Sequence, residues 1–141
     1  MKPENKELLL KDLYARLPYG VKVYFKGEIA LLFSVNPTQG FPITLDKTPT
    51  KGGGLINVSE EEIGEVKPYL RPISSMTEEE KKELGNMGTI SVCKDENNDI
   101  VCMTKQDVEE VTYLFRHHYD VFGLIPAGLA LSTDEFNPYK D

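Results

Sequence analysis

Apolar side chains in the first part of the chain recur at every third or fourth position, which is the spacing of a helix with one buried face. Residues 4–17 carry this pattern, and their charged side chains fall on the opposite side. Pro18 and Gly20 follow directly and are typical of a helix end. We therefore expect an amphipathic N-terminal helix whose buried face consists of Leu9, Leu10, Leu13, Tyr14 and Leu17.

Two runs rich in β-branched and aromatic residues come next, at positions 21–25 and 29–35. The pair Lys26-Gly27 between them suits a tight hairpin turn, because Gly27 can adopt a positive φ. The first run alternates, so its odd-numbered residues should lie buried on one face. The second run is apolar almost throughout, which predicts a central strand with both faces buried.

Residues 36–54 are rich in proline, glycine and polar side chains and are typical of a long loop. Residues 41–45 could add a short strand within it, and residues 55–58 return to the sheet. The loop offers no catalytic group, so we expect mobility rather than function for it. Its glycines at 52–54 do not form a phosphate-binding loop, because Lys51 precedes them and no helix follows.

Two prolines shape the middle of the chain. Pro68 and Pro72 favour extended backbone in the residues before them, so residues 66–77 should form a rigid apolar strut. Thr77 and Glu80 have the spacing of a capping box, which predicts that a short acidic helix begins here.

A second hairpin is expected around a turn-forming stretch of acidic and amide residues. A two-residue turn at positions 97 and 98 would pair Lys94 with Val101 and place Cys93 opposite Cys102. The two strands of this hairpin are expected at residues 89–93 and 100–104.

The last part of the chain predicts a helix over residues 105–118, with acidic side chains in its first turns where the helix dipole favours them. Residues 119–131 are apolar enough to be docked on the rest of the protein. Residues 132–141 are expected to fray.

Together these elements predict a single α+β domain, a small mostly antiparallel sheet with an N-terminal helix and a C-terminal hairpin plus helix. Its expected parts are a helix plus small sheet (1–65), the proline strut (66–77), a helix, hairpin and helix (78–131) and a tail (132–141).

Charge and composition exclude some classes of function. The chain has 141 residues, of which 23 are acidic and 16 basic, for a net charge of −7. Direct nucleic-acid binding is therefore not expected, because such binding depends on Lys and Arg neutralising phosphates. No apolar run approaches membrane-spanning length and no signal-like apolar core is visible, so we expect a cytoplasmic protein with no membrane contact.

The clearest candidates for chemistry are His117, His118 and Asp120, which could bind a metal or serve a hydrolytic enzyme. Adjacent helical side chains point about 100° apart, so the two imidazoles cannot easily share one ion. Structural roles are therefore favoured for both histidines. Cys93 and Cys102 could form a redox pair, although buried free thiols are commoner in a cytosolic chain.

An interaction role has a broader basis than a catalytic one. Aromatic side chains beside a polar rim are typical of protein interfaces, and the negative charge would steer a basic partner. We expect residues 66–77 and 117–131 to form the core and part of a contact face. The interaction residues expected there are Tyr69, Leu70, Arg71, Tyr119 and Phe122.

Three blocks, at residues 6–23, 66–80 (VKPYLRPISSMTEEE) and 117–131 (HHYD followed by GLI and GLAL), resemble a family of small uncharacterised proteins from gut anaerobic bacteria. Members of that family are often encoded in phage-like or mobile-element regions. The resemblance implies no activity, cofactor or catalytic residue. Phe115-Arg116 stands where an Asn or Ala is expected before the histidine pair, which implies a modified function in this chain.

We interpret the chain as a non-enzymatic cytoplasmic interaction or accessory protein of mobile-element origin that uses no cofactor. Two alternatives stay open: a metal-binding or hydrolytic enzyme built on His117, His118 and Asp120, and a nucleic-acid-associated regulator. The partner and the oligomeric state also stay open. The interaction hypothesis predicts one contiguous apolar patch on an otherwise acidic surface.

Overall fold

The computed structural model describes residues 1–36, 40–47, 53–86, 93–94, 96–97, 100–102 and 105–140, with the backbone alone for 85–86, 93–94, 100–102 and 105–108. The helices are α1 (Pro3–Arg16), α2 (Glu78–Asn86) and α3 (Lys105–Arg116), with short 3₁₀ turns η1 (Leu17–Tyr19), η2 (Glu60–Glu65) and η3 (Ile73–Ser75). The strands are β1 (Lys22–Phe25), β2 (Glu28–Val35), β3 (Ile43–Asp46), β4 (Leu55–Val58), β5 (Lys67–Leu70), β6 (Cys93–Lys94), β7 (Ile100–Cys102) and β8 (Leu131–Ser132). These elements confirm the α+β class.

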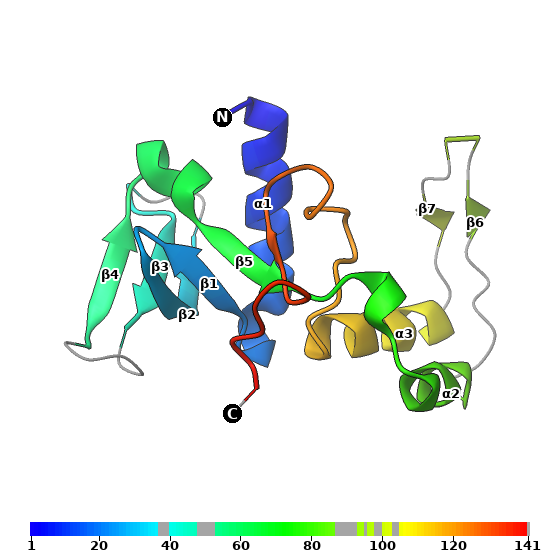
Figure 1. Ribbon diagram of the computed structural model, residues 1–141. Helices are drawn as coiled ribbons and strands as arrows, with labels where there is room; N and C mark the ends of the chain where they lie inside the picture. The colour runs from blue at the N-terminus through cyan, green and yellow to red at the C-terminus, as the bar shows by residue number, and fades with distance from the viewer. Residues whose placement is uncertain are drawn as a thin grey trace.

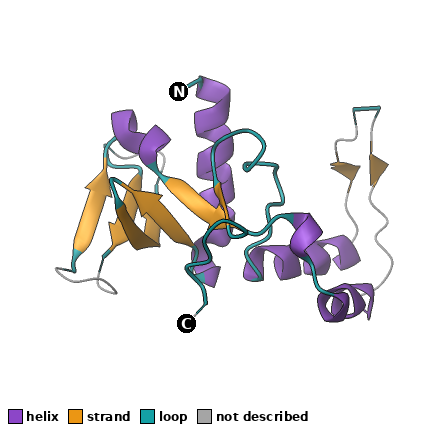
Figure 2. Cartoon of the chain, in the orientation of Figure 1, coloured by secondary structure: helices purple, strands orange, loops and turns teal. Residues whose placement is uncertain are grey.

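Six strands form one sheet in the order β4-β3-β2-β1-β5-β8, with antiparallel neighbours except for β5 and β8. Helix α1 lies against one face of the sheet, whereas α2, α3 and the β6–β7 hairpin lie beside it (Figures 1 and 2). The predicted N-terminal helix is confirmed, although Tyr14 is 63% exposed rather than buried. The core between α1 and the sheet includes Leu9, Leu13, Val21, Val23, Phe25, Leu32, Leu45 and Leu70.

The first hairpin forms as predicted. Phe25 pairs with Glu28 across the two-residue turn. Both turn residues have positive φ, 48° at Lys26 and 83° at Gly27. Such a turn matches the right-handed twist of the flanking strands.

Strand β2 is central but is not buried on both faces, which corrects the prediction. A β-bulge between Leu32 and Ser34 interrupts its pairing with β3 and places Phe33 as an additional residue. Leu32 is buried against α1, whereas Phe33 is 55% exposed. The reason is that α1 covers only the opposite face of the sheet, which leaves the part around Phe33 open to solvent.

The loop that follows contains the short strand allowed by the sequence, β3. The mobility predicted for residues 36–54 stays untested for 37–39 and 48–52, which lie outside the described residues, whereas residues 43–46 are paired on both sides within the sheet.

The proline strut is partly a strand of the sheet. Pro68 stands opposite Val23 of β1, and Tyr69 opposite Leu131 of β8. The predicted capping box is confirmed, since the Thr77 N–H donates to Glu80 Oε1 at 3.1 Å and the Glu80 N–H donates to Thr77 Oγ1 at 3.2 Å.

The second hairpin confirms the pairing of Cys93 with Cys102. The predicted pairing of Lys94 with Val101 is wrong, because an irregularity in the ladder pairs Lys94 with Ile100 instead.

Helix α3 ends two residues earlier than predicted. His118 has a left-handed φ of 66°. Its N–H donates to the Phe115 carbonyl at 3.0 Å, and the Tyr119 N–H donates to the Leu114 carbonyl at 2.9 Å. These bonds form a Schellman C-cap in which histidine occupies the position that glycine usually takes.

The predicted docking of residues 119–131 is confirmed by the burial of Leu124, Leu129 and Ala130. The prediction that residues 132–141 fray is wrong for the part that the structure describes. The Thr133 N–H donates to the Leu70 carbonyl at 3.0 Å, which continues the pairing of β8 with β5. The chain then crosses the sheet as far as Tyr139.

Candidate interaction surface

The two sequence blocks 66–77 and 117–131 lie side by side as an internal joint. The Arg71 N–H donates to the His118 carbonyl at 2.8 Å, and the Asp120 N–H donates to the Arg71 carbonyl at 2.9 Å. The Arg71 guanidinium lies 4.3 Å from the centre of the Tyr119 ring. Val66, Leu70, Leu124 and Leu129 belong to the hydrophobic core, but α1 and strands β1–β4 supply most of it, so the prediction that these blocks form the core is confirmed only in part.

The interaction residues expected from sequence do not form an exposed face. Tyr69, Leu70 and Tyr119 are buried, and Arg71 and Phe122 are half-buried. Their apolar and aromatic side chains pack inside the protein. The sequence alone does not tell whether such side chains are buried or form an exposed contact surface. The contact surface that we propose lies elsewhere.

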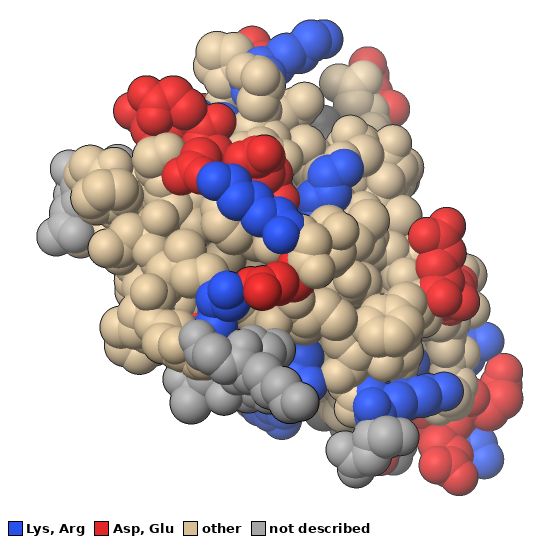
Figure 3. Space-filling model, turned by 60° about the vertical axis from the view of Figure 1, so that its left-hand side comes forward, with Lys and Arg blue, Asp and Glu red and all other residues tan. Residues whose placement is uncertain are grey.

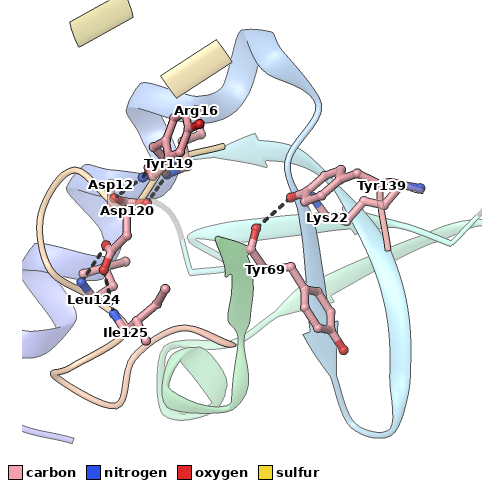
Figure 4. Close-up of polar contacts among 9 residues, drawn as sticks. All are labelled: Asp12, Arg16, Lys22, Tyr69, Tyr119, Asp120, Leu124, Ile125 and Tyr139. Atoms are coloured by element: carbon pink, nitrogen blue, oxygen red, sulfur yellow. Dashed lines mark hydrogen bonds and ion pairs between the residues drawn. The ribbon is translucent and has the colours of Figure 1, made fainter. Parts of the chain in front are cut away.

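A buried ion pair in α1 is hydrogen-bonded to the internal joint (Figure 4). Arg16 donates to both carboxylate oxygens of Asp12, at 2.5 and 3.1 Å, and to the Tyr119 carbonyl at 2.7 Å. Both side chains of the pair are fully buried. Burial raises the pKa of the Asp12 carboxyl, although Arg16 opposes the shift.

His117, His118 and Asp120 do not converge on one point. The Asp120 carboxylate accepts from the Leu124 N–H at 2.8 Å and the Ile125 N–H at 3.0 Å (Figure 4). The His118 ring stacks on Tyr139, and the His117 ring lies 4.3 Å from that of Tyr113. Among the side chains that the structure describes, no three His, Cys, Asp or Glu residues are grouped to hold a metal ion.

The role of Asp120 as a loop cap can be measured. We expect Asp120→Ala to lower the free energy of unfolding by about 1–2 kcal/mol, because two backbone N–H groups lose their acceptor. Chemical denaturation followed by circular dichroism gives the value. Asp134→Ala is the matched control, since Asp134 is exposed and its carboxylate caps no backbone group among the described residues. Equal stability of both variants would contradict the assignment.

Exposed apolar side chains lie on the face of the sheet opposite α1, next to a polar row of Ser34, Thr44 and Asn57. The ladder places Tyr24 beside Ile29, and Leu31 in one row with Asp46 and Leu55. Phe33 and Leu55 are 55% and 59% exposed, and Phe136 of the C-terminal segment is 55% exposed. We name this surface the outer-face patch and define it as Tyr24, Ile29, Leu31, Phe33, Leu55 and Phe136.

The patch contains a hollow. A cavity of about 330 Å³ lies between the β1–β2 hairpin and the C-terminal segment. Ile29, Leu31, Phe136 and Pro138 line it with apolar surface, and Lys22, Asn137 and Lys140 add polar groups at its side. The Lys22 ammonium donates to the Pro138 carbonyl at 2.8 Å, so the segment that closes the hollow is held in place.

Ion pairs surround the sheet. Lys47 pairs with Glu28, and Lys26 pairs with Glu62. The hydrogen bond from Lys26 lowers the pKa of the half-buried Glu62 carboxyl to about 2. Figure 3 shows acidic and basic side chains side by side with broad uncharged areas between them.

Comparison of the chain with protein-family models, with curated proteins and with solved structures finds no match. Within the described part of the chain, no helix has the length and apolar character needed to cross a membrane.

Sequence reasoning missed the outer-face patch although part of its signal was present. Phe33 belongs to an apolar run that was assigned to the interior, and Phe136 to a tail expected to fray. Strand alternation could have placed Tyr24 and Leu31 on a common face, but only the position of α1 shows which face stays open.

Proposed function

We propose that this chain is a non-enzymatic protein-interaction protein and that the outer-face patch is its contact surface. The observation that carries the proposal is that Phe33, Leu55 and Phe136 are exposed, while α1 covers only the opposite face of the sheet. Antiparallel sheets often expose one face, but that face is normally polar. Large apolar side chains gathered there favour a partner.

The hollow beside Leu31 supports this proposal. Interfaces draw most of their affinity from a few side chains that enter well-packed pockets. A volume of about 330 Å³ has room for one aromatic or aliphatic side chain of a partner. We therefore expect the partner to present such an anchor, and its approach to be steered by the net charge of −7 toward a basic protein.

The cytoplasmic location and mobile-element origin of the chain belong to the same proposal, supported by the sequence resemblance. The metal-binding or hydrolytic alternative is not favoured by the geometry, because Asp120 caps the backbone and lies apart from the two imidazoles. Capture of the partner with and without nuclease tests the nucleic-acid alternative.

The test is the double variant Phe33→Ser/Leu55→Ser. We expect it to weaken binding to the partner by about 10-fold or more, since each lost anchor costs about 1–2 kcal/mol. The partner would first be captured from host lysate with and without nuclease, then purified and titrated by biolayer interferometry.

The matched control is Tyr14→Ser/Ile73→Ser, which removes two exposed apolar side chains that are not part of the patch. Unchanged affinity of the patch variant, or equal losses in both variants, would refute the proposal. A partner whose capture disappears with nuclease would favour the nucleic-acid alternative instead.

A further inference from the structure

A second, larger cavity lies on the side of the internal joint. It has a volume of about 700 Å³ and is open to solvent. Arg71 at the end of β5, Arg116 and His117 at the end of α3, and Lys140 of the C-terminal segment all line it. Arg71, Arg116 and Lys140 therefore bring positive charge from three separate parts of the sequence to one cavity, in a chain whose net charge is −7.

The charges of this cavity are not all neutralised. Arg71 is occupied, because it donates to both oxygens of Glu80 at 2.7 and 2.8 Å, and this pair holds the pKa of the Glu80 carboxyl well below its usual range. Arg116 and Lys140 form no ion pair within the described residues. Asp134 is the carboxylate in the lining, so the cavity keeps a positive balance.

Neutral hydrogen-bond donors complete the lining. Thr77 accepts the Glu80 N–H through its oxygen, which leaves its hydroxyl hydrogen to donate. Asn137 accepts the Tyr139 N–H through Oδ1, which leaves its NH₂ group. Both side chains face the same cavity as Arg116.

His118 forms a rigid wall of the cavity. Its left-handed backbone and its stack on Tyr139, with ring centres 3.9 Å apart and planes 6° apart, hold the imidazole in one orientation. Its Nδ1 is buried and has no hydrogen-bond partner among the described residues. Burial and the nearby cations Arg16 and Arg71 lower the pKa of His118 to about 4, so the ring is neutral at pH 7.

We propose that this cavity binds a small phosphorylated sugar, with Arg116 and Lys140 paired to the phosphate and Thr77 and Asn137 donating to its oxygens. A phosphate dianion matches two unpaired cations and several donors better than a single carboxylate does. The volume lies in the range of small-molecule sites and exceeds what a phosphate ion alone needs. Asp134 can accept from a sugar hydroxyl.

The experiment uses glucose 6-phosphate as the probe and follows the His117 and His118 ring resonances by NMR. We expect saturable shifts below about 10 mM ligand, which corresponds to a Kd near or under 1 mM. Glucose at the same concentration should leave the resonances unchanged, and inorganic phosphate should bind more weakly.

The test variant is Arg116→Gln/Lys140→Gln, and both of its side chains are exposed, so the fold should persist. We expect its affinity to fall by about 10-fold or more. The matched control, Lys2→Gln/Lys26→Gln, removes the same charge at exposed positions that do not line the cavity and should bind as the wild type does. Absence of saturable shifts, shifts with glucose alone, or equal losses in the two variants would overturn the proposal.

Discussion

Arg16→Met is expected to lower the free energy of unfolding by about 3–5 kcal/mol, because it leaves a buried carboxylate without its cation. Asp12 and Arg16 are fully buried, and Arg16 also donates to the Tyr119 carbonyl at 2.7 Å. Removing the guanidinium therefore breaks the ion pair and the link between α1 and the residues after α3. Urea denaturation at pH 7 measures the loss.

The double variant Asp12→Asn/Arg16→Met separates charge from packing. We expect it to recover a large part of the loss, because a neutral amide no longer carries the desolvation penalty of an ion. Arg116→Met is the matched control, since Arg116 is an exposed arginine on α3. Equal stability of Arg16→Met and Arg116→Met would contradict the assignment.

The stability of Arg16→Met should depend on pH through the Asp12 carboxyl. Burial raises its pKa in the folded protein above that of the unfolded chain, so the free energy of unfolding falls as the pH rises through the unfolded-state value and recovers as the pH falls. Without Arg16 this shift grows. The deficit of Arg16→Met relative to the wild type should therefore shrink as the pH falls.

Tyr139→Ala is expected to cost about 3–5 kcal/mol, the range for removing a large aromatic side chain from a packed site. The Tyr139 hydroxyl accepts from the Lys22 N–H and donates to the Tyr69 carbonyl, both at 2.9 Å (Figure 4). Its ring also stacks on His118. The residue thus joins β1, β5 and the end of α3. Thermal and urea unfolding measure the change in the free energy of unfolding.

Tyr139→Phe keeps the ring and removes the hydroxyl, so a smaller loss of about 1–3 kcal/mol is expected. Burial raises the pKa of Tyr139, and its stabilising contribution should therefore disappear as the pH rises above about 10, the ordinary tyrosine value. Tyr139→Phe should lose less stability than the wild type over that interval. A change below about 0.5 kcal/mol for Tyr139→Ala, the range of ordinary surface substitutions, would mean that the C-terminal segment frays after all.

Features set by neighbouring residues were predictable from sequence. The Lys26-Gly27 turn and the Thr77–Glu80 capping box depend on contacts within a few residues, and the structure has both. Features set by distant partners were not predictable. His118 ends α3 early in a position that favours glycine, where its ring stacks on Tyr139 of the C-terminal segment.

The candidate sites follow the same division. Tyr69 and Tyr119 looked like contact residues because composition does not distinguish a buried aromatic side chain from an exposed one. Phe33 looked like a core residue because an apolar run contains no information about which sheet face a helix covers. The cavity lined by Arg116 and Lys140 has no continuous sequence signal, because its walls are far apart in the chain.

By itself, the sequence determined the α+β class, the helix near the N-terminus, the two hairpins and the docking of residues 119–131, because periodicity and turn chemistry act over short distances. Tertiary structure decided that α1 covers a single face of the sheet and that the C-terminal segment returns to β5. Those two choices depend on packing between segments that are distant in sequence. They leave the outer-face patch exposed and bring Arg116 and Lys140 to the same cavity.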